Sequence, residues 1–163
     1  MLIRLKNKDT LLIDEFKFKC SIGKNHTKLK KKEGDLSTPR GNFLIKSLFY
    51  RPDREKKFKT TIPKYKIQKN MGWCNDPKNK NYNSLIKVNK NIRHEKIYRS
   101  DFKYDLLLVI DYNLKKPVPF KGSAIFLHLT KNYIPTAGCI AIKRNDMLVL
   151  LKLINEKSRI LIS

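Results

Sequence analysis

The chain has 163 residues, 40% of them hydrophobic and 31% charged, which predicts one globular domain over residues 1–163 with its own core. Its apolar runs are strand-sized, as in "LLLVI" at 106–110, which argues against a membrane-spanning helix. The net charge of +23 favours anionic partners, such as nucleic acid or a peptide with several free carboxylates. Equally, lysines spread along the whole chain are consistent with compositional drift.

Residues 1–20 predict a strand, a turn and a second strand. They lack the continuous apolar segment and the small-residue cleavage site of a signal peptide. The chain is therefore expected to be cytoplasmic by default, unless a leader was trimmed or export uses another route. Phe16, Phe18 and Cys20 alternate with lysines, which is typical of a strand with one buried face. A charged, turn-rich loop follows, and strand character resumes over 41–50.

Residues 51–83 form a long polar stretch rich in proline and asparagine. A loop of this length in a compact domain is usually functional or disordered. Trp73, the only tryptophan, lies in this stretch beside Cys74. That neighbourhood indicates a packed loop, which we expect to lie over a cleft.

The C-terminal half predicts strands over 104–112 and 123–129, a short strand over 139–143, and a last strand near 159–163. In the second of these, alternation puts Ala124, Phe126 and His128 on one face. Residues 145–157 predict the one clear helix, with Asn145 as its N-cap. Its apolar stripe is Met147, Leu150, Leu151 and Ile154. The expected fold class is therefore mostly β, with β-sandwich-like sheets and one C-terminal helix.

The three cysteines, Cys20, Cys74 and Cys139, cannot all pair within the chain, and no C-x-x-C is present. A disulfide scaffold is therefore not expected. A metal site at Cys74, His94 and Glu95 is conceivable on residue types alone. Its spacing matches no known ligand pattern, so no metal is predicted.

His128 closes one predicted strand and Cys139 opens the next. If these strands are neighbours and the loop 130–138 turns the chain back, both side chains project at the same end of the sheet. A cysteine acts as a nucleophile only as its thiolate, and an adjacent imidazole can take the proton. The pair therefore fits covalent acyl transfer.

Neighbouring residues fit the same chemistry. Gly138 permits close backbone approach, and the N–H groups of Gly138 and Cys139 are candidates for an oxyanion hole. The basic residues Lys131, Lys143 and Arg144 are expected to lower the pKa of the thiol. Spacing alone leaves the alternative open, because buried cysteines are usually inert and a histidine at a strand end is usually structural.

The segment "HLTKNYIPTAGCIAI" resembles the active-site signature of the YkuD-type L,D-transpeptidases, a histidine on one strand followed by Ser/Thr-x-Gly-Cys on the next. The matching residues are His128, Thr136, Gly138 and Cys139. Upstream, "EGDLSTPRGNF" is similar to the family's Thr-Pro-x-Gly-x-Phe element, at Thr38, Pro39, Gly41 and Phe43. Further similar segments occur in the expected order, so the resemblance spans nearly the whole chain.

The resemblance implies a mostly β catalytic domain with no metal or organic cofactor. It implies that Cys139 attacks the peptide of a peptidoglycan stem, with His128 as general base. An amine of a second stem then accepts the acyl group and forms a cross-link, whereas water would make the protein a carboxypeptidase. Many members carry an arginine two residues after the cysteine, where this chain has Ala141. The bond used, at the diamino acid or nearer L-alanine, therefore stays open.

Candidate substrate-binding residues are Thr136, from the signature, and arginines that would pair with stem carboxylates. Trp73 and Asp76 lie on the long stretch that we expect to form a lid, and Tyr112 follows a strand. Each has a plain structural alternative, since tryptophan usually packs and surface arginine is usually solvated. The arginines in question are Arg51, Arg54 and Arg99.

The competing interpretation is a non-catalytic basic module that binds anionic wall polymer or nucleic acid. It predicts salt-dependent affinity that is indifferent to loss of Cys139. No array of aromatic platforms on a basic face is recognisable, so nucleic acid is not expected as a partner. The expected partners are donor and acceptor stem peptides, handled by a monomer. The chemistry points to the periplasm or cell wall, although no signal peptide is visible.

Overall fold

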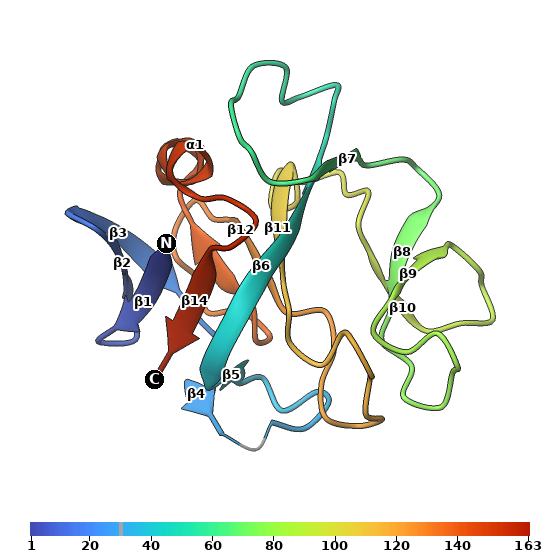
Figure 1. Cartoon of the computed structure of the whole chain (residues 1–163). Coiled ribbons are helices and arrows are strands. Elements are labelled where there is room, and N and C mark those ends of the chain that lie inside the picture. The colour runs from blue at the N-terminus through green and yellow to red at the C-terminus, as the bar shows by residue number, and fades with distance from the viewer. Residues whose placement is uncertain (30) are drawn as a thin grey trace.

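The computed structural model describes residues 1–29 and 31–163. Nearly all of its regular structure is strand (Figure 1). The elements are β1 (Leu2–Lys6), β2 (Thr10–Ile13), β3 (Phe16–Ser21), β4 (Thr27–Lys28), β5 (Thr38–Pro39), β6 (Gly41–Tyr50), β7 (Lys64–Lys66), β8 (Met71–Cys74), β9 (Leu85–Lys87), β10 (His94–Lys96), β11 (Leu106–Ile110), β12 (Phe126–Leu129), β13 (Ile140–Ile142), α1 (Arg144–Leu153) and β14 (Arg159–Ile162). The expected mostly β fold with one C-terminal helix is confirmed in the described part of the chain.

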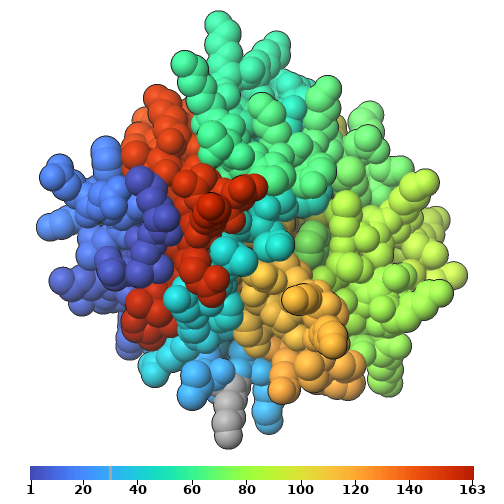
Figure 2. Space-filling view, in the orientation of Figure 1, coloured from blue at the N-terminus to red at the C-terminus, as the bar shows by residue number. Residues whose placement is uncertain are grey.

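The main sheet closes on itself. Its strand order is β11-β12-β13-β3-β2-β1-β14-β6-β7, and a further pairing of β11 with β6 joins the two ends of the first eight. Strand β1 runs parallel to β14, so the beginning and the end of the described chain lie side by side. Figure 2 shows this neighbourhood as blue against red atoms on one face.

Side chains alternate between two apolar clusters, and this explains the unbroken apolar run of β11. Leu106, Leu108 and Ile110 belong to the main core, which residues from the strands of the closed sheet and from α1 fill. Leu107 and Val109 point the other way, into a second cluster. A strand buried on both faces reads as a continuous apolar run.

The second cluster lies between the closed sheet and a small sheet of β10, β8 and β9. Trp73 on β8 stacks edge-to-face on Phe126 of β12, with ring centroids 5.2 Å apart. In Figure 1 these three green strands stand on the opposite side of β6 and β11 from β1–β3. Cys139 belongs to this second cluster. The small sheet therefore helps to form the surroundings of the thiol.

Several local expectations need correction. The helix begins at Arg144 with Lys143 as its N-cap, so the prediction of Asn145 as N-cap is wrong. The physical reason is that β13 ends at Ile142 and the chain enters the helix almost directly. Residues 51–83 are not one loop, because they contain β7 and β8. Within the described ranges, α1 is too short to cross a bilayer, and no other helix could do so.

Candidate functional site

Strands β12 and β13 are parallel neighbours, with His128 opposite Ala141 and Leu127 opposite Ile140. The expectation that the loop 130–138 turns the chain back is therefore wrong, since it crosses over to start β13 in the same direction. His128 and Cys139 still lie on the same face of the sheet, as expected, because residues that pair across two strands share a face. Cys139 lies beside Phe126, and His128 follows one pleat repeat along the same face.

The thiol of Cys139 is enclosed by backbone groups of β12 and the residues before it. Its Sγ donates to the carbonyl oxygen of Ala124 at 3.2 Å and accepts the N–H of Phe126 at 3.4 Å. Burial raises the pKa of Cys139 to about 12, although the Phe126 amide lowers it. The thiol of Cys139 is therefore neutral at physiological pH.

We expected Lys131, Lys143 and Arg144 to lower the pKa of this thiol, but none of them is among the groups that shift it. Arg144 forms an ion pair with Glu55 at 2.7 Å. The ammonium group of Lys143 lies over the ring of Tyr133. The cation that lowers the pKa of Cys139 is Lys31, and its effect is smaller than that of burial. It comes from a distant part of the sequence.

The imidazole of His128 is also neutral. Its Nδ1 lies 3.0 Å from the carbonyl oxygen of Leu129, so Nδ1 carries the proton and Nε2 presents a lone pair. Burial lowers the pKa of His128 to about 4. The ring of Tyr104 meets the imidazole edge-to-face, with centroids 5.2 Å apart. This packing fixes the orientation of a group that has the protonation state of a general base.

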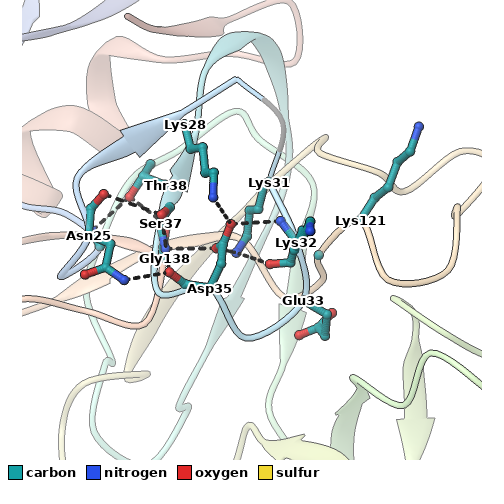
Figure 3. A network of polar contacts seen from close by, with 12 residues as sticks. Asn25, Lys28, Lys31, Lys32, Glu33, Asp35, Ser37, Thr38, Lys121 and Gly138 are labelled. Carbon is teal, nitrogen blue, oxygen red and sulfur yellow. Dashed lines mark hydrogen bonds and ion pairs between the residues drawn. The ribbon is translucent and has the colours of Figure 1, made fainter.

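The turn that carries Gly138 is held by two threonines. Thr136 Oγ1 accepts the N–H of Gly138 at 3.1 Å and donates to the carbonyl oxygen of Cys139 at 2.5 Å. Thr38 Oγ1 donates to the Gly138 carbonyl oxygen at 2.9 Å (Figure 3). Gly138 has φ of +141°, and a Cβ there would come within 2.8 Å of the Ser37 carbonyl oxygen. No other residue type fits this position without strain.

A buried lysine flanks the same turn. The side chain of Lys31 is 3% exposed, and its Nζ forms an ion pair with Asp35 at 2.8 Å. Figure 3 shows Lys28 and Lys31 both directed at Asp35, which also accepts the N–H of Ser37. A Cβ at Gly138 would lie 3.5 Å from Lys31 Nζ. The ammonium group is therefore held beside the Gly138 backbone.

Two adjoining cavities meet at His128. The smaller, of about 250 Å³, is lined by Cys139 and Gly138, and the larger, of about 350 Å³, by Arg99. His128, Glu95 and other residues line both. The shared residues are Glu95, Tyr104, His128, Thr136 and Ala137. The imidazole thus stands at the junction of a two-part cleft.

The three arginines predicted to hold substrate lie in different places. Arg51 is buried, pairs with Asp53 through two bonds of 2.8 and 2.7 Å, and donates to the Arg99 carbonyl oxygen at 2.6 Å. Arg54 binds the carboxylate of Asp105 at 3.0 Å and two carbonyl oxygens. Arg51 and Arg54 therefore tie segments of the fold together. Arg99 alone lines the cleft.

The lid residues and Tyr112 all contact other parts of the protein, and Trp73 belongs to the same apolar cluster as Cys139. Trp73 is buried in the second cluster, and its Nε1 donates to Asn83 at 2.9 Å. Asp76 closes a local turn by accepting the N–H of Lys78 at 3.0 Å. Tyr112 donates to the Lys121 carbonyl oxygen at 2.5 Å and lines a separate cavity of about 700 Å³. These contacts give a structural reason for each of the three side chains, and their assignment to the substrate stays a prediction.

Sequence reasoning considered Glu95 only for a metal site and gave Tyr104 and Lys31 no role, yet all three line the cleft. Each comes from a segment far from the signature in sequence, and none carries a recognisable spacing. Thr38 was quoted only as part of the Thr-Pro-x-Gly-x-Phe element, with no role. Among residues 1–29 and 31–163, no three metal-ligating side chains converge.

The chain belongs to the YkuD family, because the model of the L,D-transpeptidase catalytic domain matches residues 2–162. No curated protein matches the chain. Among solved structures, it is similar to one described as the structure of Bdellovibrio bacteriovorus Bd1075, with 15% identity and a TM-score of 0.49. That alignment covers 99% of this chain and 47% of the other, so the chain spans about half the length of that protein.

Proposed function

We propose that this protein is an L,D-transpeptidase that cross-links peptidoglycan through an acyl-enzyme on Cys139, with His128 as general base. The observation that carries the proposal is the placement of both side chains on one face of β12 and β13, lining the same cavity. Membership of the YkuD family supports the reaction class. The proposed catalytic unit is the single domain over residues 1–163.

The neutral resting pair determines how the first step would run. As the thiol attacks the stem carbonyl carbon, Nε2 of His128 takes its proton, so no thiolate has to persist in the buried site. The C–S bond forms, the carbonyl becomes an oxyanion, and the C–N bond then breaks. His128 then gives the proton that it took from the thiol to the leaving amine. The products are an acyl-enzyme and a neutral histidine.

The oxyanion needs a preorganised donor. Gly138 and Cys139 were the two expected amides, and the N–H of Gly138 already donates to Thr136 Oγ1. We assign the larger role to the N–H of Cys139, which belongs to the peptide unit whose carbonyl group Thr38 fixes. The ammonium group of Lys31 is a second source of positive potential beside this peptide.

Carboxylates of the stem peptide would meet cations that line the cleft, among them Arg99 and Lys31. Thr136 is expected to act through the turn rather than on the substrate. We place the protein outside the cytoplasmic membrane, in the periplasm or cell wall, where its substrate is, and expect it to act as a monomer. YkuD domains typically work on peptidoglycan at that location.

The test is incubation of the purified protein with tetrapeptide and pentapeptide muropeptides, followed by mass spectrometry. C139A is the test variant, and C74A, which removes another buried thiol, is the matched control. We expect a cross-linked dimer with the wild type and C74A but not with C139A. A trimmed monomer instead of a dimer would establish a carboxypeptidase. Product from C139A would refute the assigned nucleophile, and salt-sensitive adhesion without any product would favour the binding module.

A further inference from the structure

A carboxylate lies at the junction of the two cavities. Glu95 is the central residue of β10, and its side chain lines both halves of the cleft together with His128. Tyr104 fixes it by donating its hydroxyl to Glu95 Oε1 at 2.7 Å. The side chain of Glu95 keeps 32% of its surface exposed. The carboxylate is therefore both held in place and accessible to a ligand.

Among the described residues, Glu95 makes no tight ion pair, although Arg93 and Lys103 line the same two cavities. The nearest guanidinium, Arg99, approaches Oε1 no closer than 4.0 Å. Arg99 instead donates two hydrogen bonds to the carboxylate of Asp101, from Nε at 2.9 Å and from Nη2 at 2.6 Å. A partly exposed carboxylate in a cleft attracts a cation. The protein as a whole has a net charge of +23, so Glu95 is a negative group on a mostly positive molecule.

Activation of the nucleophile does not explain this residue. Burial is the main reason why the pKa of Cys139 is raised, and the charge of Glu95 raises that pKa further. It therefore opposes formation of the thiolate. The other carboxylate at the smaller cavity, Glu33, has partners of its own, because it accepts hydrogen bonds from Ser123 at 2.8 Å and from Tyr82. Glu95 is the carboxylate that a ligand reaches beside the imidazole.

We propose that Glu95 is the subsite for a primary ammonium group, the side-chain amine of the acceptor stem. This inference rests on the proposed function. Glu95 would bring the ammonium group to His128, and His128 Nε2 would take a proton as the amine attacks the acyl carbon. The C–N bond forms, the C–S bond breaks, and His128 returns that proton to the sulfur of Cys139. The second ammonium proton leaves to water, so the step is balanced.

The first experiment measures partitioning of the acyl-enzyme. Wild type and E95Q are loaded with a donor tetrapeptide and offered either a dipeptide with a side-chain ammonium group or hydroxylamine, a nucleophile that is neutral at pH 7. The ratio of aminolysis to hydrolysis is read by mass spectrometry. E156Q removes the same charge from an exposed surface position and is the matched control.

E95Q is expected to lower the ratio about tenfold with the ammonium acceptor, the size of one charge-assisted contact. With hydroxylamine the ratio should change less than twofold, and E156Q should match the wild type with both acceptors. An equal fall with both nucleophiles, or no fall with either, would overturn the proposal. Thermal melting of each variant identifies any loss that comes from unfolding.

A second measurement separates this inference from the proposed function. If the wild type forms no acyl-enzyme, the proposed function fails, yet binding can still be measured. C139A and the double variant C139A/E95Q are titrated by NMR with the ammonium dipeptide and with its N-acetylated form. A preference for the ammonium form that disappears with E95Q supports the subsite. The absence of any preference in C139A contradicts it.

Discussion

The hydroxyl group of Thr38 donates a 2.9 Å hydrogen bond to the carbonyl oxygen of Gly138, across 100 positions of sequence. The same oxygen of Thr38 accepts the N–H of Gly23 at 2.9 Å. Thr38 is fully buried. One side chain therefore fixes the plane of the peptide that precedes Cys139, which is the peptide whose N–H we assign to the oxyanion.

T38V tests this relationship, because valine keeps the shape and removes the hydroxyl group. It leaves the Gly138 carbonyl and the Gly23 amide without their partner, which should cost about 2 kcal/mol of unfolding free energy. We expect kcat to fall about tenfold with little change in KM, and T38S to recover most of the loss. Steady-state kinetics and urea unfolding measure both effects. Equal kinetics for T38V and T38S would show that the hydroxyl group does not act on the site.

G138A should damage both fold and activity. Gly138 has positive φ, and its added Cβ would meet the Ser37 carbonyl oxygen at 2.8 Å. Gly34 also has positive φ, but a Cβ there has nothing within 4 Å. G34A therefore measures backbone strain alone, about 1 kcal/mol. We expect G138A to cost at least about 1 kcal/mol more in urea unfolding. Equal costs would mean that the turn moves freely to admit the methyl group.

Stability should depend on pH through His128. Burial holds its pKa at about 4 in the folded protein, against 6.5 for an ordinary histidine. The unfolded chain therefore binds the proton first as pH falls, and folding loses stability between about pH 6.5 and 4. The loss attributable to His128 is about 3 kcal/mol at most. Urea unfolding at pH 7.5 and 5 should show a smaller pH effect in H128Q than in the wild type. The same slope in both would contradict the burial of a neutral imidazole.

The thiol of Cys139 should be slow to alkylate in the absence of substrate. Its pKa is raised to about 12 by burial, so little thiolate is present at pH 8. Iodoacetamide should modify it at least about 100-fold more slowly than a free cysteine, as read by peptide mass mapping over time. Denatured protein is the control for accessibility. Fast alkylation of the folded protein would indicate a preformed thiolate and a different first step.

Arg51 and Arg99 should separate structure from binding. R51A removes a buried guanidinium that joins Asp53 to the Arg99 carbonyl oxygen, which should cost about 2 kcal/mol of stability. R99A removes a half-exposed cation of the cleft and should raise the KM for the donor stem several-fold, with a smaller effect on stability. Chemical unfolding and donor kinetics on both variants check the division. The reverse pattern would restore Arg51 as the substrate contact.

Strand patterns near the chemistry were readable because they are local. Alternation in 123–129 places Phe126 and His128 on one face, and they lie there in the structure. Trp73 and Arg51 show the limit of such reasoning. An aromatic or an arginine in a polar stretch looks the same whether it contacts a ligand or holds two segments together. Only the neighbours of each side chain distinguish these cases.

The sequence by itself determined the β-rich fold, the single C-terminal helix, the family, and the candidate pair of Cys139 and His128. These features depend on the periodicity of apolar residues and on short motifs, both of which can be recognised in the sequence alone. The tertiary structure alone decided that β12 and β13 run parallel and that the thiol and imidazole rest neutral. It also brought Thr38, Lys31 and Glu95 to the site. These features arise from burial and from contacts between distant segments, and neither can be predicted from the local sequence.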